Sequence, residues 1–118
     1  MARIIVCGSR NFEDHGIIQA ALLEHAQLYD TLVHRNLPGA DLWADWLWRE
    51  HCIDQRHAAF ITTYEQGDSD LVREGGKRLL TFLMPGDHEH DVFIKECLEA
   101  RIFGFSRPER FDYGVSSQ

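Results

Sequence analysis

The sequence predicts an α/β fold: a Rossmann-like three-layer αβα sandwich with a mainly parallel sheet of about five strands. Short apolar runs of β-prone residues alternate along the chain with segments whose apolar residues recur every three or four positions. Glycine or proline breakers follow three of the apolar runs. Because strands that alternate with helices connect through right-handed crossovers, we expect a parallel sheet with helices on both faces.

In the first half of the chain, the apolar run at residues 4–7 stops at Gly8, which predicts a buried strand followed by a tight turn. Apolar residues at helical spacing predict a helix over residues 14–28. The short apolar run at residues 31–34 predicts a second strand, and helical spacing resumes over residues 40–51 after a Pro-Gly break.

In the second half, the segment RHAAFI at residues 56–61 predicts a third strand, and residues 68–74 predict a short helix that ends at a glycine pair. The segment LLTFLM at residues 79–84, apolar except for one threonine, predicts a buried strand. Apolar residues at helical spacing predict a helix over residues 92–100, and residues 102–105 predict the last strand.

The composition is that of a soluble protein with one domain, placed at residues 1–105, and a polar C-terminal tail at residues 106–118. Twelve basic and 19 acidic side chains give a net charge of −7, which argues against nucleic acid or an anionic membrane surface as a partner. No apolar run approaches the roughly 20 residues of a membrane span. Three scattered cysteines without a CxxC pair and the lack of a secretion signal predict reduced thiols and a cytoplasmic protein.

Three turns are expected at the carboxyl ends of the strands, where parallel sheets bind ligands. They contain Gly8-Ser9-Arg10, Pro38-Gly39-Ala40-Asp41 and Pro85-Gly86-Asp87. Backbone amides at the helix starts favour anions at this edge. We interpret Arg10 as an anion ligand, with a surface arginine as the alternative. Asp41 fits a residue that positions a ribose hydroxyl or polarises a water, and it equally fits a plain helix N-cap.

Three segments resemble the SLOG superfamily, the Rossmann-like group that holds the LOG phosphoribohydrolases and DprA-type proteins. They are RIIVCGSRNF, TLVHRNLPGADLWADWLWREHCI and FLMPGDHEHDVFIKECLEARI, and the resemblance is nearest to the small YspA-like branch. It implies a nucleotide-derived phosphate ligand, a homodimer, and a ligand site made of Gly8, Ser9, Arg10, Asn11, Gly39, Asp41, Pro85 and Gly86. We expect no cofactor. The small size and divergence of the chain are also the basis of a hypothesis that it originates from a phage or mobile element.

The chain departs from the family pattern at two of the turns. Arg35-Asn36 replaces a glycine pair, and residues 87–90 (DHEH) replace the G-x-G-T of the third turn. Carboxylates in this turn repel a phosphate, and Phe93 stands where the LOG hydrolases carry a glutamate. We therefore expect a non-catalytic ligand-binding domain. The alternatives are a phosphoribohydrolase-type enzyme that cleaves an N-glycosidic bond, and a degenerate site in a protein that acts as a protein–protein interaction module.

Histidines and tryptophans leave two further questions open. His88 and His90 are candidate metal ligands, but we favour a solvated acidic loop and predict no metal site. Trp43 and Trp46 share one side of the predicted helix while Trp48 points elsewhere, so we expect one of the three to be exposed or covered by a partner.

Overall fold

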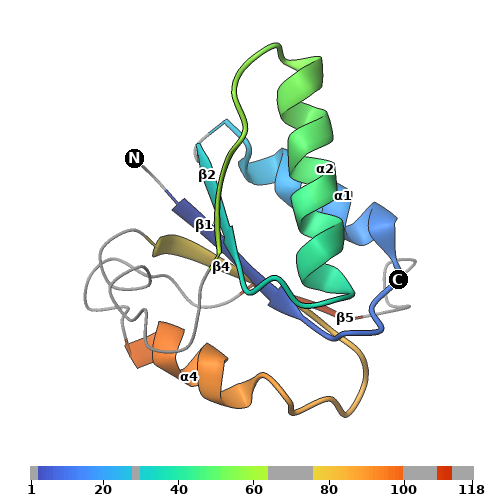
Figure 1. Cartoon of the computed structure of the whole chain (residues 1–118). Helices are drawn as coiled ribbons and strands as arrows, with labels where there is room; N and C mark the ends of the chain where they lie inside the picture. The colour runs from blue at the N-terminus through green and yellow to red at the C-terminus, as the bar shows by residue number, and fades with distance from the viewer. Residues whose placement is uncertain (1–2, 28–29, 64–75, 100–108, 113–118) are drawn as a thin grey trace.

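The computed structural model describes residues 3–27, 30–63, 76–99 and 109–112, in which strands alternate with helices (Figure 1). In chain order the elements are β1 (Arg3–Gly8), α1 (His15–His25), β2 (Thr31–His34), α2 (Ala40–Asp54), β3 (Phe60–Thr63), β4 (Gly76–Leu83), α4 (Asp91–Glu99) and β5 (Glu109–Asp112). The helix predicted at residues 68–74 and the strand predicted at residues 102–105 lie outside the described residues. Among the described helices, none is long and apolar enough to cross a membrane.

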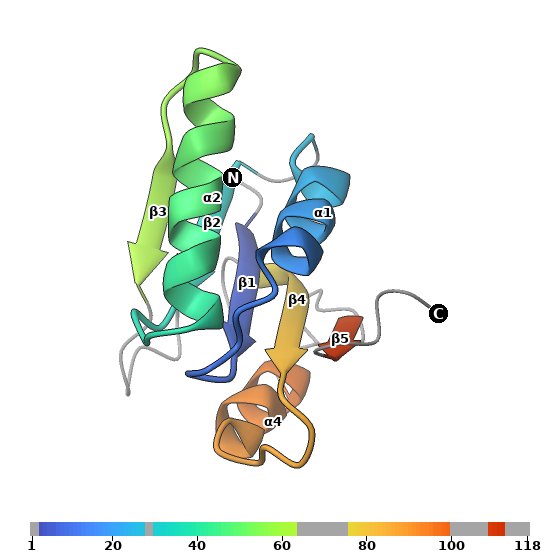
Figure 2. The same ribbon diagram turned by 90° about the vertical axis from the view of Figure 1, so that its right-hand side faces the viewer.

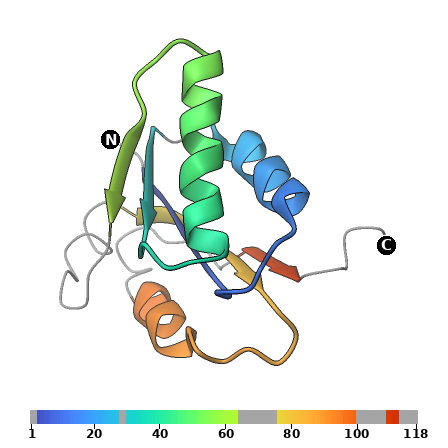
Figure 3. The same cartoon turned by 45° about the vertical axis from the view of Figure 1, so that its right-hand side comes forward.

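The strands form one five-stranded sheet in the order β3-β2-β1-β4-β5. Each neighbouring pair of strands runs parallel, which is the arrangement that the alternation with helices predicted. Helices α1 and α2 cover one face of the sheet and α4 lies on the other, so the layers are those of an αβα sandwich (Figures 1 and 3). The α/β prediction is confirmed.

The alternation of side chains along β1 divides the core between the two faces of the sheet. Ile4 and Val6 belong to the larger cluster, which packs under α1 and α2. Ile5 and Cys7 belong to a smaller cluster that includes Phe93 of α4. All four β1 side chains are fully buried, so β1 is the central strand in burial as well as in position.

The cysteines are core residues. Cys7, Cys52 and Cys97 are buried and free of disulfide bonds. Burial raises the pKa of the Cys7 thiol well above its ordinary value, and it raises the pKa of the Cys97 thiol to about 12. Because a protonated thiol is a poor nucleophile, these two cysteines contribute to packing rather than to covalent chemistry.

The boundaries of the third strand differ from the prediction. β3 begins at Phe60, whereas the strand had been expected over residues 56–61. The amides of Arg56 and His57 instead donate to the carbonyls of Ile53 and Cys52, at 3.0 Å each, and close the end of α2. Arg56 has a φ of 59°, in the left-handed region typical of helix ends. Residues 56 and 57 therefore terminate the helix.

The last strand is a correction to the predicted tail. β5 (Glu109–Asp112) lies within residues 106–118, which the sequence assigned to a polar tail, and it pairs in parallel with β4, from Leu80 opposite Glu109 to Leu83 opposite Asp112. The segment ERFD has three charged residues out of four, so its hydropathy carries no strand signal. An edge strand needs only backbone hydrogen bonds to one neighbour, and those bonds leave no trace in the composition.

The strand order reverses on either side of β1, so a topological switch point lies between β1 and β4. These two strands run side by side and end at the same edge of the sheet (Figure 2). In open parallel sheets this is the edge at which ligands bind. The turns that follow β1, β2 and β4 are therefore where a functional site is expected.

Candidate functional site

Ser9 joins the turns that follow β1 and β4 to the start of α2. Its amide donates to the Phe82 carbonyl at 2.8 Å, and its carbonyl accepts from the Ala40 amide at 3.2 Å. Its hydroxyl accepts from the Met84 amide at 2.8 Å and donates to the Asp87 carboxylate. Ser9 is fully buried, so the convergence of the three predicted turns is part of the interior of the molecule.

Two glycines allow this close approach. A Cβ on Gly8 would lie 2.2 Å from the Phe82 carbonyl oxygen and 2.6 Å from the Ala40 Cβ. Gly39 has a φ of 82°, and a Cβ there would lie 2.3 Å from the Ser9 carbonyl oxygen. Both glycines, which the family resemblance placed in the ligand site, are thus required by packing even without a ligand.

Arg10 reaches across to the loop that follows β4. Its Nε lies 2.6 and 2.8 Å from the two carboxylate oxygens of Glu89. The Arg10 side chain is 53% exposed and the Glu89 side chain 42%. The guanidinium predicted to hold an anion therefore holds a carboxylate of the same chain, at the surface of the switch point.

Asp87 fixes the backbone of that loop. One of its carboxylate oxygens accepts from the Ser9 hydroxyl, and the other accepts from the Glu89 amide at 2.9 Å. These two hydrogen bonds, the Ser9 one first, lower the pKa of Asp87 below its ordinary value. The Asp87 carboxylate is therefore ionised at neutral pH and ties the third turn to the first.

Asp41 is a buried carboxyl in the first turn of α2. Its Oδ2 accepts from the Arg35 amide at 2.7 Å, while Oδ1 has no hydrogen-bond partner among the described residues. Gly39 is the N-cap of α2, so Asp41 is not the cap that the sequence offered as one interpretation. Burial raises the pKa of Asp41 to about 7, although the Arg35 amide and guanidinium act in the opposite direction.

Arg35 links Asp41 to His90. Its Nη1 donates to the His90 Nδ1 at 2.9 Å, and its guanidinium lies 4.8 Å from the centre of the Phe93 ring. Because a guanidinium only donates, the neutral His90 ring carries its proton on Nε2. Burial, with the Arg35 charge beside it, lowers the pKa of His90, so the ring stays neutral at pH 7. The sequence analysis noted Arg35 only because it stands where the SLOG pattern has a glycine, and it gave this residue no role.

The candidate metal ligands do not come together. His88 is exposed and its Nδ1 lies 3.1 Å from the Asp91 carboxylate, whereas His90 is buried against Arg35. His34 lies in β2, where its Nδ1 accepts from the Asn36 amide and its Nε2 donates to Asp45 at 2.7 Å. Within residues 3–27, 30–63, 76–99 and 109–112, no group of three or more His, Cys, Asp or Glu side chains is arranged to hold a metal ion.

The tryptophans of α2 divide between core and surface. Trp48 is buried in the larger cluster, and Trp46 is 54% exposed. Trp46 meets the edge of Trp43 with ring centres 6.0 Å apart, and Trp43 stacks on His15 at 3.5 Å. The exposed tryptophan is thus Trp46, although the sequence had set Trp48 apart from the other two.

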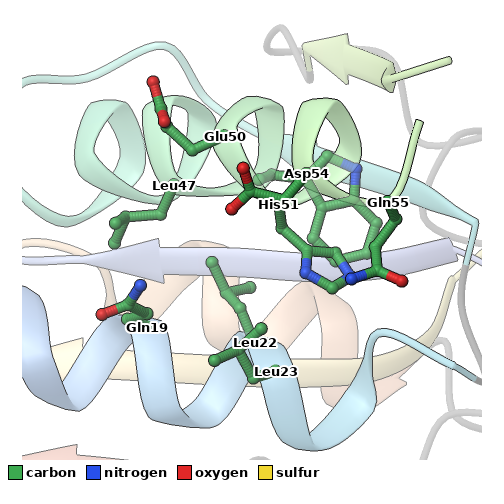
Figure 4. A pocket seen from close by; sticks show the side chains of 9 residues that line it. Gln19, Leu22, Leu23, Leu47, Glu50, His51, Asp54 and Gln55 are labelled. Atoms are coloured by element: carbon green, nitrogen blue, oxygen red, sulfur yellow. The ribbon is translucent and has the colours of Figure 1, made fainter. Parts of the chain in front are cut away.

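A hollow in the surface lies away from the turns. It measures about 260 Å³ between α1 and α2 and is lined by Leu22 and Leu47 together with polar side chains such as Gln19 and Asp54 (Figure 4). Its α2 residues come from the second half of the helix, whereas the start of α2 packs on Ser9. The hollow and the converging turns therefore lie at opposite ends of α2.

Neither a family model nor a curated protein matches this chain.

We predict that Gly39→Ala destabilises the protein far more than Gly86→Ala does. The two glycines have similar φ values of 82° and 77°, but a Cβ on Gly86 meets nothing within 4 Å. Left-handed backbone strain alone costs about 1 kcal/mol at Gly86, whereas the collision with the Ser9 carbonyl raises the loss at Gly39 to about 3 kcal/mol or more. Urea denaturation measures both losses, and equal losses would contradict the packing of the two turns.

Asp41→Asn is expected to change how stability depends on pH. The pKa of Asp41 is raised from 3.8 to about 7 on folding, so the folded chain binds the proton more tightly than the unfolded chain does. Between these two values the free energy of unfolding then falls as pH rises, by up to about 1.4 kcal/mol per pH unit from this group. In Asp41→Asn this decrease in the free energy of unfolding is absent, while the side-chain oxygen of the asparagine still accepts the hydrogen bond from the Arg35 amide.

Urea unfolding of both proteins from pH 4 to pH 7 measures this contribution. His90 has a lowered pKa and contributes the opposite slope below its ordinary value of 6.5, but it does so in both proteins. The difference between the two curves therefore isolates Asp41. Parallel curves would show that Asp41 is ionised in the folded protein.

Proposed function

We propose that the protein is a non-catalytic SLOG-type domain that binds a phosphate-bearing, nucleotide-derived small molecule above the carboxyl ends of β1 and β4. The observation that carries this proposal is the position of Arg10, a half-exposed guanidinium held at the switch point by a carboxylate. An exposed ion pair of this kind contributes only ~0–1 kcal/mol. A phosphate forms stronger, charge-assisted hydrogen bonds to a guanidinium and is able to replace the carboxylate.

The residues of the resemblance divide into two roles in this proposal. Arg10 and the neighbouring Asn11 are exposed and contact the ligand, and Pro85 and Gly86 are exposed on the facing turn. Gly8, Ser9, Gly39 and Asp41 lie beneath them and position the turns. We assign Asp41 to holding the Arg35 amide rather than to a ribose hydroxyl, because its carboxyl is fully buried.

The chemistry of the site favours binding over hydrolysis. Phe93, which stands at the position of the family's glutamate, is buried beneath the Arg35 guanidinium. Asp87 is ionised and committed to Ser9 and the Glu89 amide, so it has no proton to donate to a leaving group. Asp41, with a pKa of about 7, carries a proton for part of the time, but its carboxyl is fully buried. Cleavage of a glycosidic bond needs an acid that reaches the leaving group, and we therefore propose no reaction.

A thermal-shift panel of nucleotides, nucleotide sugars and cyclic dinucleotides tests the proposal. A ligand that binds only the folded chain raises Tm by about 5–10 °C at a concentration about 100 times its Kd. We expect Arg10→Ala to abolish the shift, because the phosphate loses its guanidinium.

Arg49→Ala is the matched control for this panel. Arg49 is 56% exposed and its Nε also lies 2.6 Å from a carboxylate, that of Asp45, but it lies on α2 away from the turns. The shift should survive in this variant. A shift that also survives in Arg10→Ala would place the ligand elsewhere, and a panel without any shift would contradict the proposed function.

The outer face of α2 supports a second function, protein–protein interaction. Leu42, Trp46 and Ile53 are 42%, 54% and 69% exposed, and their spacing places them on one side of the helix. Exposed tryptophans and neighbouring apolar side chains are typical of interfaces. This face fits the homodimer that the family resemblance implies.

Trp46→Ala tests the second function by sedimentation velocity over a range of protein concentrations. We expect the natural chain to dimerise and the variant to need at least about tenfold more protein, since a central tryptophan contributes about 2 kcal/mol at an interface. Leu23→Ala, an exposed apolar residue of α1 (48%), is the control and should dimerise normally. A natural chain that stays monomeric at all concentrations would contradict the dimer.

A further inference from the structure

The contact between Glu89 and Arg10 differs from the Ser9–Asp87 and Arg35–His90 contacts, which also join the turns, because both of its partners are partly exposed. Both Glu89 oxygens lie within 2.8 Å of the Arg10 Nε. Glu89 is the one acidic side chain that contacts this guanidinium among the described residues. The position that a ligand phosphate would take on Arg10 is therefore occupied by the chain itself.

The backbone beside Glu89 is held independently of this contact. Asp87 accepts from both the Ser9 hydroxyl and the Glu89 amide, and the Asp87 amide donates to the Met84 carbonyl at 3.1 Å. The Asp91 amide donates to the His88 carbonyl at 3.3 Å on the other side. The Glu89 side chain is thus able to leave Arg10 by rotation of its own torsions, while the loop stays docked.

Little else holds the Glu89 carboxylate in place. The His90 Nε2 lies 3.9 Å from Glu89 Oε2 and, at the same distance, from Asp87 Oδ2. This distance is too long for a hydrogen bond, and Nε2 has no hydrogen-bond partner among the described residues. Asp87, by contrast, is anchored by a fully buried hydroxyl. Of the two carboxylates at the switch point, only Glu89 is free to exchange.

We infer that Glu89 is an internal competitor for the anionic group of the ligand, a carboxylate that closes the site in the free protein and is displaced from Arg10 when phosphate binds. This inference rests on the proposed function. Glu89 is tethered close to Arg10, so it competes at a high effective concentration. A ligand that displaces Glu89 must then carry a phosphate. A ligand carboxylate would bind Arg10 no more strongly than Glu89 does, and it lacks the high effective concentration that Glu89 has as part of the chain.

The consequence is that removing the Glu89 charge tightens phosphate binding. Glu89→Gln keeps the size of the side chain but loses the ionic contact with Arg10. Because the exposed pair must break before phosphate binds, its loss is expected to lower the Kd for inorganic phosphate about fivefold. The same variant should also begin to bind acetate, which the natural chain excludes.

Asp91→Asn is the matched control. Asp91 is an exposed carboxylate two residues further along, paired with His88 at 3.1 Å rather than with Arg10. It removes the same unit of charge from the same region of the chain. The four proteins to compare are the natural chain, Glu89→Gln, Asp91→Asn and Arg10→Ala. Each is titrated with inorganic phosphate, and binding is followed by the amide NMR signals of positions 10 and 11.

Each outcome of the titration decides the inference. Tighter binding by Glu89→Gln alone, lost when Arg10 is replaced, supports an internal competitor. Equal tightening by Glu89→Gln and Asp91→Asn would reduce the effect to general charge repulsion and overturn the inference. Unchanged affinity in Glu89→Gln, with binding by the natural chain that depends on Arg10, would overturn the inference and leave the proposed function standing. No phosphate or nucleotide binding by either the natural chain or Glu89→Gln would overturn both.

Discussion

The hydrogen bonds of Ser9 hold together the turns that follow β1, β2 and β4. One buried residue uses its amide, its carbonyl and its hydroxyl to join the end of β1 to β4, to the start of α2 and to the Asp87 loop. Each of these groups lies in the interior, where an unpaired polar atom is costly. Hydrogen bonds to all three polar groups of Ser9 therefore fix the turns. Because Arg10 follows Ser9 directly in the chain, its backbone position is fixed as well.

Burial separates the three carboxyl groups of this region into different roles. Asp41 is fully buried, and this burial outweighs the neighbouring backbone amides and guanidinium groups, so its pKa is raised. Asp87 is less buried and accepts two hydrogen bonds, so its pKa is lowered and it acts as an anionic tie. Glu89 reaches the surface, where its carboxylate contacts a half-exposed guanidinium. The pKa values of Asp41 and Asp87 thus shift in opposite directions because their surroundings differ.

Side chains rather than backbone amides hold the second and third turns together. A glycine turn presents backbone amides, whereas the turns here present side chains that bind one another. Arg35 bonds to His90 and lies over the Phe93 ring, so it links the second turn to the third. These contacts explain why residues that look unfavourable for a phosphate cradle still form a well-packed edge at the switch point.

Hydrophobic periodicity and Gly-Pro breakers are local signals, and they were sufficient to predict the alternation of strands and helices, the parallel sheet and the turns at its carboxyl edge. They missed β5 and the start of β3, since an edge strand and a helix end are defined by backbone pairing rather than by side-chain type. Three features came from the folded chain: Arg10 contacts Glu89, Arg35 contacts His90, and Trp46 rather than Trp48 is exposed. Arg10 and Glu89 are 79 positions apart in the sequence, and Arg35 and His90 are 55 positions apart. Residues this distant come into contact only when the chain folds.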